Sequence, residues 1–328
     1  MSLTACVSGA SGFVGSHLVR GLHGQGWDVH VLARRSSLLN EIEGVPVTVH
    51  LGDLSDYDSV RAAMPEPFDA VFHVAASTNF WAKNNRLQDR VNIDGTRNML
   101  EAAAAAGVRR FIHTSSFTTW GFRNTELTEE SARTGATDWI NYVRSKYRAE
   151  QLVLDKASNR QMEAVILNPA HILGPGDQHN WSRMIRMVQQ GKLFAAPPGS
   201  GNFCDVREVA NAHIAAFHRG RSGEKYLLGG EYAAFADVVK IAGEVVGCKV
   251  PVKAAPAWII RAWAHLNTIT ASFSGREPDV TPESAAMVSY HVNCNSGKAR
   301  KELDYRFTPI RQLIEDTAAW MQRQGLLS

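Results

Sequence analysis

The amino-acid sequence predicts an α/β protein with a parallel sheet covered by helices on both faces and a small C-terminal α/β domain. Residues 3–25 carry the first observation, a short apolar run followed at once by glycines and then by an amphipathic helical pattern. Short apolar runs then alternate with longer helical patterns, which is typical of such a sheet. After Asn168-Pro169 the alternation weakens and Gly and Pro become frequent, so a second, smaller domain is expected to begin there.

The composition excludes several classes of protein. A chain of 328 residues is long enough for one large domain or two smaller ones. With 45% hydrophobic and 20% charged residues it has the composition of a soluble globular protein, and a formal net charge of +3 gives no indication of nucleic-acid binding. The four cysteines are far apart without a C-x-x-C pair, which favours reduced thiols and a cytoplasmic location. No unbroken apolar stretch of about 18 residues predicts a membrane span.

Three glycines come after the first predicted strand with G-x-x-G-x-x-G spacing. We expect Gly9 to allow a sharp turn, Gly12 to let backbone amides approach a pyrophosphate at the positive end of the helix, and Gly15 to let helix and strand pack closely. This strand, turn and helix predict a Rossmann-type nucleotide site. A short glycine motif also occurs in ordinary turns, so its meaning depends on the residues later in the chain.

The remaining elements are assigned from their hydrophobic periodicity. Strands are expected at 3–8, 28–33, 46–50, 69–74, 109–114, 163–168 and 225–228, and helices near 14–25, 56–64, 87–106, 140–158 and 205–217. Residues 1–168 form the predicted dinucleotide-binding domain, to which 203–228 return, and residues 169–202 and 229–328 form the predicted substrate domain. A helical pattern at 257–273, interrupted by Arg261 and His265, is interpreted as a helix packed over the substrate domain or a second subunit, with membrane contact as the alternative.

The end of the second predicted strand bears on the choice of nucleotide. An acidic residue about 20 positions after the glycines would accept the ribose hydroxyls of NAD and repel a 2′-phosphate. This chain has Ala33 there, followed by Arg34 and Arg35. Two guanidinium groups offer charge-assisted donors to a 2′-phosphate, which favours NADP(H). The alternative interpretation is a solvated basic loop.

Two further segments end strands on the nucleotide side. Asp53 comes after the third strand, where its carboxylate would accept from an adenine amino group while Leu54 covers the ring; an ordinary turn-forming Asp is the alternative. Val74, Ala75 and Ala76 end the fourth strand, and their small side chains would permit close approach of a cofactor.

The fifth strand and the helix after it carry groups suited to acid–base chemistry. Thr114-Ser115-Ser116 ends the strand, and Tyr142 and Lys146 stand at i and i+4 on one face of the helix. An unperturbed tyrosine has a pKa of about 10, so a neighbouring ammonium is needed for it to exchange protons near neutral pH. A Y-x-x-x-K pair is common by chance; its position after the glycine turn and the serine pair is what points to catalysis.

In this order, the residues resemble the extended short-chain dehydrogenase/reductase superfamily over essentially the whole chain. The resemblance implies catalytic roles for Ser116, Tyr142 and Lys146, and a place for Asn92 in a water-mediated proton relay. The spacing from Gly121 favours Ser116 over Ser115. It further implies a nicotinamide-side segment at residues 168–177. The implied cofactor contacts are Gly9, Gly12, Phe13, Val14, Gly15, Arg34, Arg35, Asp53, Leu54, Val74, Ala75, Ala76, Thr114, Tyr142, Lys146, Pro169 and His171. For His171 a purely structural role is an equal alternative.

Within the superfamily the chain is most similar to the branch of dihydroflavonol-reductase-like and 3β-hydroxysteroid-dehydrogenase-like proteins, which includes hopanoid-associated sugar epimerases. The segments 79–83, 224–231 and 298–303 carry this similarity, and Arg34 falls where the dihydroflavonol-type reductases hold their 2′-phosphate arginine. Nucleotide-sugar enzymes have an R-D-Y-type segment whose Arg grips the sugar nucleotide. This chain has Gly201-Asn202-Phe203 instead, which weakens the case for a nucleotide sugar.

These patterns predict an NADP(H)-dependent oxidoreductase that interconverts a ketone or aldehyde and an alcohol, with no metal. The resemblance further implies a homodimer through the helices at 87–106 and 140–158. Trp81, Trp120, Trp139 and Trp181 come from segments expected near the substrate and favour an apolar or aromatic one. The alternative interpretation is that half or more of them are ordinary core or surface residues. Two alternatives remain: a nucleotide-sugar epimerase or dehydratase that recycles a tightly bound cofactor, and a nucleotide-sensing protein without catalysis.

Overall fold

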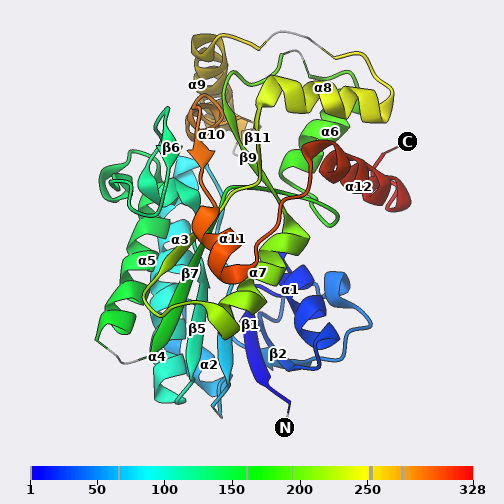
Figure 1. The fold of residues 1–328 in the computed structure, drawn as a ribbon. Helices are drawn as coiled ribbons and strands as arrows, with labels where there is room; N and C mark the ends of the chain where they lie inside the picture. Colours follow the sequence, from blue (N-terminus) through cyan, green and yellow to red (C-terminus); the bar gives the residue numbers. More distant parts are fainter. Residues whose placement is uncertain are drawn as a thin grey trace.

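A seven-stranded parallel sheet forms the centre of the larger part of the molecule (Figure 1). The computed structural model describes residues 2–65, 67–159, 162–193, 195–250, 254–274, 277–278 and 280–327. Every neighbouring pair in the sheet is parallel, in the order β3-β2-β1-β4-β5-β7-β10. The strands are β1 (Thr4–Ser8), β2 (Asp28–Ala33), β3 (Thr48–Leu51), β4 (Ala70–His73), β5 (Arg110–Thr114), β7 (Glu163–Pro169) and β10 (Lys225–Leu228).

The strand order reverses between β1 and β4. The chain first builds the sheet outward from β1 to β3, and then returns to add β4 on the other side of β1. In open parallel sheets a ligand binds beyond the carboxyl ends of the strands at this reversal. Ser8 and His73, the last residues of β1 and β4, pair in register, so the turns after these two strands lie next to each other.

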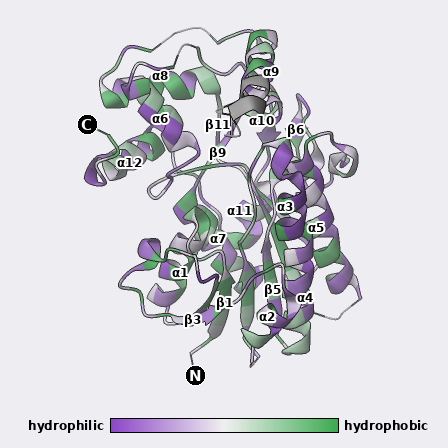
Figure 2. Ribbon diagram, turned by 180° about the vertical axis from the view of Figure 1, so that it is seen from behind, coloured by the Kyte–Doolittle hydropathy of each residue, from purple (hydrophilic) through white to green (hydrophobic). Residues whose placement is uncertain are grey.

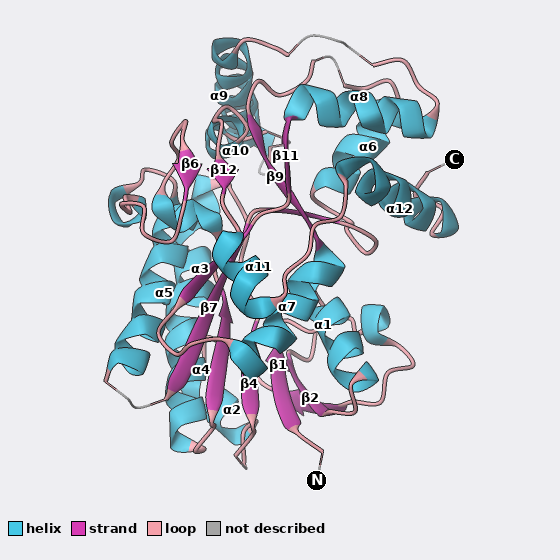
Figure 3. Ribbon diagram, viewed as in Figure 1, coloured by secondary structure: helices cyan, strands magenta, loops and turns pink. Residues whose placement is uncertain are grey.

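Helices cover both faces of the sheet, as Figure 3 shows. One face packs on α1 (Phe13–Gly24), α7 (Val206–Arg219) and α11 (Gly297–Leu303), and the other on α2 (Tyr57–Ala62), α4 (Gly95–Ala105) and α5 (Asn141–Ser158). Successive residues of a strand point to opposite faces, so Val7 joins the core beneath α1 while Cys6 joins the core beneath α4. Such strands must be apolar on both sides, which explains their continuous apolar runs.

The helix expected at 87–106 is divided. A short helix α3 (Asn85–Asp89) passes through a π-helical turn at Arg90–Asp94 into α4. A π-helical turn inserts one extra residue and frequently marks a functional site. Here it contains Asn92, whose side chain is buried.

A smaller part lies beyond the carboxyl ends of the large sheet. Its sheet has the order β11-β9-β8, from β8 (His171–Leu173), β9 (Ser200–Asp205) and β11 (Glu231–Ala234). Phe203 and Phe235 lie in its core with apolar residues of three helices, α6 (Trp181–Gln189), α8 (Phe235–Val246) and α12 (Ile310–Arg323). The remaining elements are α9 (Ala257–Ser274), α10 (Pro282–Met287) and the paired strands β6 (Glu126–Leu127) and β12 (Asn293–Cys294).

The predicted fold class is confirmed. All seven expected strands occur within two residues of their predicted ends. The helix expected at 257–273 is α9, which packs chiefly on α10. From the C-terminal segment, α11 returns to pack on α7 and β10, so this segment contributes to the larger part as well as the smaller one.

Membrane spans and metal clusters are both absent from the described residues. No helix in this part of the chain is long and apolar enough to cross a membrane. The same residues contain no group of three or more His, Cys, Asp or Glu side chains arranged to hold a metal ion.

Candidate active site

The glycine turn after β1 is packed so closely that side chains would not fit. Gly9 has φ +76°, and a Cβ on it would lie 2.6 Å from the backbone nitrogen of Ala75. A Cβ on Gly15 would collide with the carbonyl oxygen of Gly9, which is the close helix–strand packing expected. Helix α1 begins after Gly12 without a side-chain cap, so amides of its first turn remain available for an anion. The turn therefore fits a pyrophosphate.

The basic pair lies at the carboxyl end of β2. Arg34 and Arg35 are both exposed, and the backbone nitrogen of Arg34 donates to Ser37 Oγ at 3.1 Å while Ser37 donates its own amide to the Arg34 carbonyl at 2.9 Å. This short turn holds two guanidinium groups beside the end of the strand. Its geometry fits a 2′-phosphate donor site.

Asp53 closes a turn of its own. Its Oδ1 accepts from the amide and from the hydroxyl of Ser55, both at 2.8 Å, and these bonds lower the pKa of the carboxyl. This is the turn-forming behaviour given above as the alternative to an adenine contact. Leu54 packs against Gly95 of α4, where a Cβ would come within 3.0 Å of the Leu54 Cβ.

Tyr142, Ser116 and Lys146 come together at the carboxyl end of β5. Burial raises the pKa of Tyr142 above its ordinary value, and the neighbouring Ser116 side chain lowers this pKa to a smaller extent. The Lys146 ammonium donates to the Thr114 carbonyl at 2.7 Å, and burial lowers the pKa of Lys146 to about 8. The structure therefore brings the three predicted catalytic residues together.

The choice between the two serines has a structural counterpart. The Ser115 hydroxyl turns away from Tyr142 and donates to Glu150 Oε2 at 2.6 Å. The Ser116 Oγ instead accepts from Thr118 Oγ1 at 2.9 Å and lies near enough to Tyr142 to influence its pKa, so Ser116 is the better candidate of the two serines.

Glu150 is a site residue that the sequence reasoning missed. Its side chain is completely buried and forms an ion pair with Arg133 at 2.7 Å. Besides Ser115, its Oε2 accepts from Asn168 Nδ2 at 2.9 Å, and Asn168 also donates to the Ser116 carbonyl at 3.1 Å. Glu150 thus contacts the Ser115 side chain directly and the Ser116 carbonyl through Asn168. The available signal was its spacing, one turn beyond Lys146 on the buried stripe of α5.

Asn92 makes three side-chain hydrogen bonds to protein atoms. Its Oδ1 accepts from the Ser77 amide at 2.7 Å, and its Nδ2 donates to the Ser77 carbonyl at 3.0 Å and to Ser145 Oγ at 2.9 Å. Both ends of the amide are therefore engaged with protein atoms. Asn92 fixes the segment after β4, including Ala75 and Ala76, against the helix that carries Tyr142.

His171 lies inside the aromatic core of the smaller part. Its ring centroid is 5.3 to 5.6 Å from those of four aromatic rings, namely Phe117, Trp181, Phe203 and Phe235, and burial lowers its pKa to about 4. These surroundings fit the structural alternative for this histidine. Pro169 is buried at the end of β7.

The surroundings of Tyr142 on its other side are apolar. The Phe80 ring lies 5.2 Å from the Tyr142 ring, and Phe122 stacks on Tyr290 at 5.2 Å within the same cluster. Of these rings only Phe80 belongs to a segment that the sequence analysis singled out. Phe122 and Tyr290 come from segments more than 160 positions apart, so no local pattern could join them.

The four tryptophans have different positions. Trp120 is fully buried beneath the Arg133 guanidinium, and Trp139 is 56% exposed. Trp181 belongs to the aromatic core around His171, and Lys83 lies over the ring of Trp81. Trp120 and Trp139 thus fit the alternative interpretation of ordinary core and surface residues.

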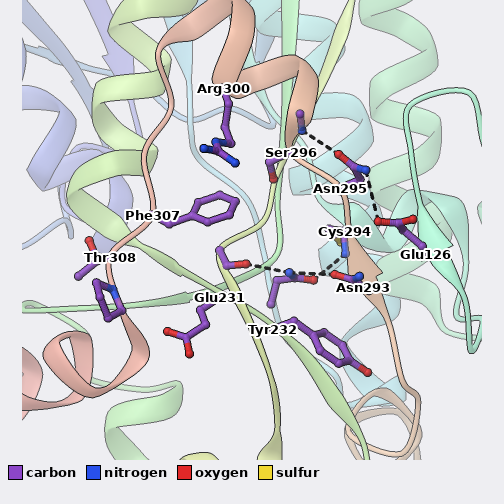
Figure 4. Close-up of a pocket in the computed structure, with 14 residues that line it drawn as sticks. Glu126, Glu231, Tyr232, Asn293, Cys294, Asn295, Ser296, Arg300, Phe307 and Thr308 are labelled. Carbon is purple, nitrogen blue, oxygen red and sulfur yellow. Dashed lines mark hydrogen bonds between the residues drawn. The ribbon is translucent and has the colours of Figure 1, made fainter.

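A pocket of about 500 Å³ lies elsewhere, between β11, β12, α11 and residues 307–309 (Figure 4). None of the predicted site residues lines it. Asn295 Nδ2 donates to Glu126 Oε1 at 3.3 Å, and the Arg300 guanidinium lies over the Phe307 ring. Its polar groups are thus partly paired with one another, and the pocket is separate from Tyr142.

Fold and site together define a dinucleotide-binding enzyme of the short-chain dehydrogenase/reductase type. The family model described as "NAD dependent epimerase/dehydratase family" matches residues 5–229. The chain belongs to this family, the extended short-chain dehydrogenases/reductases.

Individual relatives match over nearly the whole chain. The dihydroflavonol 4-reductase-like protein of Synechocystis sp. is 31% identical, over 97% of this chain and 94% of that protein. Sterol demethylase protein B of Methylococcus capsulatus is 30% identical, over 99% and 100% respectively. Plant cinnamoyl-CoA reductases match at 26–28% identity. The crystal structure of gox2253 superimposes with a TM-score of 0.85 at 32% identity, over 100% of both chains.

Proposed function

We propose that the protein is an NADP(H)-dependent oxidoreductase that interconverts a ketone or aldehyde and an alcohol on a small, apolar or aromatic substrate. The observation that carries this proposal is the gathering of Tyr142 and Ser116, with the buried Lys146 ammonium one helical turn further along the helix and the Phe80 ring beside that of Tyr142. A proton donor, a second hydroxyl and a cation are thus gathered next to apolar side chains.

The residues present fit the cofactor. The uncapped start of α1 after Gly12 would hold the pyrophosphate, and the exposed pair Arg34 and Arg35 would hold a 2′-phosphate. When bound, NADP(H) supplies or accepts the hydride. No carboxylate stands at the end of β2 to repel the phosphate, because Ala33 occupies that position.

The side chains of this chain supply the proton and stabilise the charge. In the direction of reduction, Tyr142 transfers its phenolic proton to the carbonyl oxygen of the substrate, which becomes the hydroxyl of the alcohol. Ser116 donates a hydrogen bond to the same oxygen as negative charge develops on it. The ammonium of Lys146 stabilises the phenolate that remains, and the reverse transfer serves alcohol oxidation.

The substrate class is inferred from the side chains beside the phenol. Phe80, Phe122, Tyr290 and the apolar residues Ile140 and Ala286 form one cluster around Tyr142. An apolar or aromatic substrate would gain free energy by burying its surface there, whereas a sugar nucleotide would leave its polar groups without partners. The names of the matched reductases, which refer to dihydroflavonol and cinnamoyl-CoA, agree with an aromatic carbonyl substrate.

The test is a turnover screen of ketones, aldehydes, hydroxysteroids and nucleotide sugars, with NADPH and NADH run side by side. We expect NADPH oxidation with an apolar carbonyl compound. Tyr142→Phe should lower kcat by about 10²- to 10⁴-fold, because the proton donor is lost. Tyr147→Phe, which removes a hydroxyl one turn further along the same helix, is the matched control. Full activity in Tyr142→Phe would refute the mechanism.

A separate arm tests the choice of nucleotide. Charge-assisted hydrogen bonds contribute about 1.5–3 kcal/mol, so Arg34→Ala should reduce the preference for NADPH over NADH by about 10- to 100-fold. Binding of NADH should change little in the same variant. A wild-type protein that prefers NADH would overturn the assignment of Arg34 and Arg35.

A nucleotide-sugar epimerase or dehydratase is the second candidate, favoured by the description of the matched family model. Against it stands the segment Gly201-Asn202-Phe203, which is buried in β9 and carries no arginine. The next arginine, Arg207, forms ion pairs with Asp205 and Asp316, both at 2.6 Å. Retained cofactor without net turnover, together with thermal stabilisation by a sugar nucleotide, would favour this candidate.

A further inference from the structure

The large apolar side chains of helix α9 face away from the protein. Its exposed large apolar side chains are Trp258 (70% exposed), Ile259 (43%), Trp263 (58%) and Leu266 (59%). The residues that face the protein are smaller or more polar, with Ala264 fully buried and Asn267 and Thr268 half-buried. A helix that only packed over a domain would bury its large apolar side chains, so this face requires another explanation.

The exposed apolar residues of α9 form one continuous surface. At 100° per residue, Trp258, Ala262, Leu266, Ile259 and Trp263 follow one another around about 140° of the helix. Among the described residues, twelve large apolar side chains are exposed, and four of them lie within these nine positions. Figures 1 and 2 place α9 at the outer edge of the molecule, with hydrophobic segments along it.

The charges on α9 indicate what covers this surface. The eighteen residues of the helix contain no Asp or Glu. Arg261 and His265 are exposed and lie along one flank of the apolar face, where an arginine can reach phosphate groups while its neighbours enter an apolar layer. Tryptophan is the side chain that most favours the boundary between lipid headgroups and acyl chains. The pattern is that of a helix lying in the plane of an anionic membrane surface.

The dimensions of the surface favour a lipid layer over a second protein. The nine positions span only about 13 Å of helix, whereas a stable protein interface buries about 800 Å² on each partner. A lipid surface needs no complementary shape and accepts a single protruding helix. We propose that α9 docks the protein on the surface of an anionic bilayer, with Trp258, Ile259, Trp263 and Leu266 inserted and Arg261 against lipid phosphates.

The docked surface would lie beside the candidate active site. Helix α9 packs on α10, and Ala286 of α10 belongs to the apolar cluster that contains Ile140 and Tyr142. The segment between α9 and α10 is joined to residue 79 by the hydrogen bond from Asn79 Nδ2 to Glu277 Oε1 at 2.6 Å. An apolar substrate dissolved in the membrane would therefore have a short path to Tyr142. Docking itself does not depend on the proposed reaction.

The experiment is co-sedimentation of the full-length protein with vesicles of phosphatidylcholine mixed with phosphatidylglycerol, and with vesicles of phosphatidylcholine alone. We expect wild-type protein to sediment with the mixed vesicles and less with the neutral ones. Trp258→Ser/Trp263→Ser should lower the partition coefficient by about tenfold or more, because two aromatic side chains leave the apolar layer. Arg261→Glu should lower binding to the mixed vesicles only.

Tyr57→Ser is the matched control, because it replaces an exposed aromatic side chain on α2. It should bind vesicles as the wild type does, and all variants should keep the wild-type circular dichroism spectrum because the replaced residues are exposed. Absence of sedimentation with either vesicle, or unchanged binding by the double tryptophan variant, would overturn the proposal. If the wild-type protein does not bind vesicles and the double tryptophan variant differs from it in mass by light scattering, the apolar face joins two copies of the chain. Turnover of a water-soluble carbonyl compound tests the reaction independently.

Discussion

Lys146 is a cation with almost no access to solvent. It is 2% exposed, and burial lowers its pKa from 10.5 to about 8, while the Glu150 carboxylate one turn further along α5 works in the opposite direction. Removing an ammonium from water disfavours its charged form, which explains the direction of the shift. The group that we propose stabilises the Tyr142 phenolate therefore titrates within the range in which an enzyme can be assayed.

This shift predicts a pH dependence of carbonyl reduction. As pH rises through about 8, Lys146 loses its charge, so we expect kcat/KM to be level below this pH and to fall up to tenfold per unit above it. The profile of kcat/KM reports groups of the free enzyme and should be measured with NADPH saturating. Lys146→Arg keeps a cation at all these pH values, and its lower activity should show no alkaline decline. An identical decline in that variant would contradict the assignment.

Residues could be predicted where one local pattern carries the chemistry. Tyr142 and Lys146 stand at i and i+4, and the glycines adjoin a strand, so the sequence alone was enough to propose them as site residues. Glu150 could not be predicted because its partners Arg133 and Asn168 come from other segments of the chain. Spacing alone does not distinguish a buried carboxylate from an exposed one. Asn92 could be identified, but which atoms it contacts depended on where the chain after β4 lies.

Helix α5 is the element that assembles the site. Tyr142, Lys146 and Glu150 succeed one another at four-residue intervals on its inner face, which places all three against the ends of β5 and β7. Glu150 is the most buried of them, and its ion pair with Arg133 joins a carboxylate without solvent exposure to a guanidinium whose side chain is 14% exposed. The Arg133 guanidinium is further held between the rings of Trp120 and Tyr147.

Loss of one partner of this buried pair should therefore be costly. Glu150→Gln leaves the Arg133 charge unpaired, and we expect the free energy of unfolding in urea to fall by about 3–5 kcal/mol. The Glu163 side chain, which pairs with Arg110, is 53% exposed. Glu163→Gln breaks this pair and should cost only about 0–1 kcal/mol. The double variant Arg133→Met/Glu150→Met should lose less free energy of unfolding than the sum of the losses in Arg133→Met and Glu150→Met. Equal losses for Glu150→Gln and Glu163→Gln would contradict the importance of burial.

Strands were easier to predict than the elements of the smaller part. A strand buried on both faces must be apolar throughout, so β1, β4 and β5 are visible as short runs in the sequence. Helices α6 and α8 come after segments rich in Gly and Pro, where the alternation of strand and helix is lost, and their core forms between residues far apart in the chain. The π-helical turn before α4 leaves no trace in hydrophobic periodicity because both its sides remain helical.

At the scale of the whole molecule, the centre of the large sheet contains neutral histidines. His73 is held between Ser8 and Thr96, and His213 between Thr114 and the Val209 carbonyl. His113 stacks on His73 with ring centroids 5.4 Å apart, and neither of its ring nitrogens has a hydrogen-bond partner among the described residues. Burial lowers the pKa of His73 to about 3 and that of His213 to about 4, and that of His113 falls well below 6.5.

The sign of the resulting pH dependence is set by proton binding. Below pH about 6.5 the unfolded chain protonates these histidines while the folded protein does not, so the unfolded state binds more protons and stability falls with falling pH. Each pH unit between the two pKa values corresponds to about 1.4 kcal/mol per histidine. We therefore expect the free energy of unfolding in urea to drop by several kcal/mol between pH 7 and pH 5.

His113→Phe separates this effect from general acid sensitivity. Phenylalanine has a similar planar shape, and no hydrogen bond of His113 is lost, so the variant should fold and be at least as stable at pH 7. Because one buried titrating group is removed, its loss of stability between pH 7 and pH 5 should be smaller than that of the wild type by about 2 kcal/mol. His23→Phe, at an exposed position of α1, controls for the loss of a histidine as such. A pH dependence of His113→Phe equal to that of the wild type would show that acid destabilisation begins elsewhere than at the centre of the sheet.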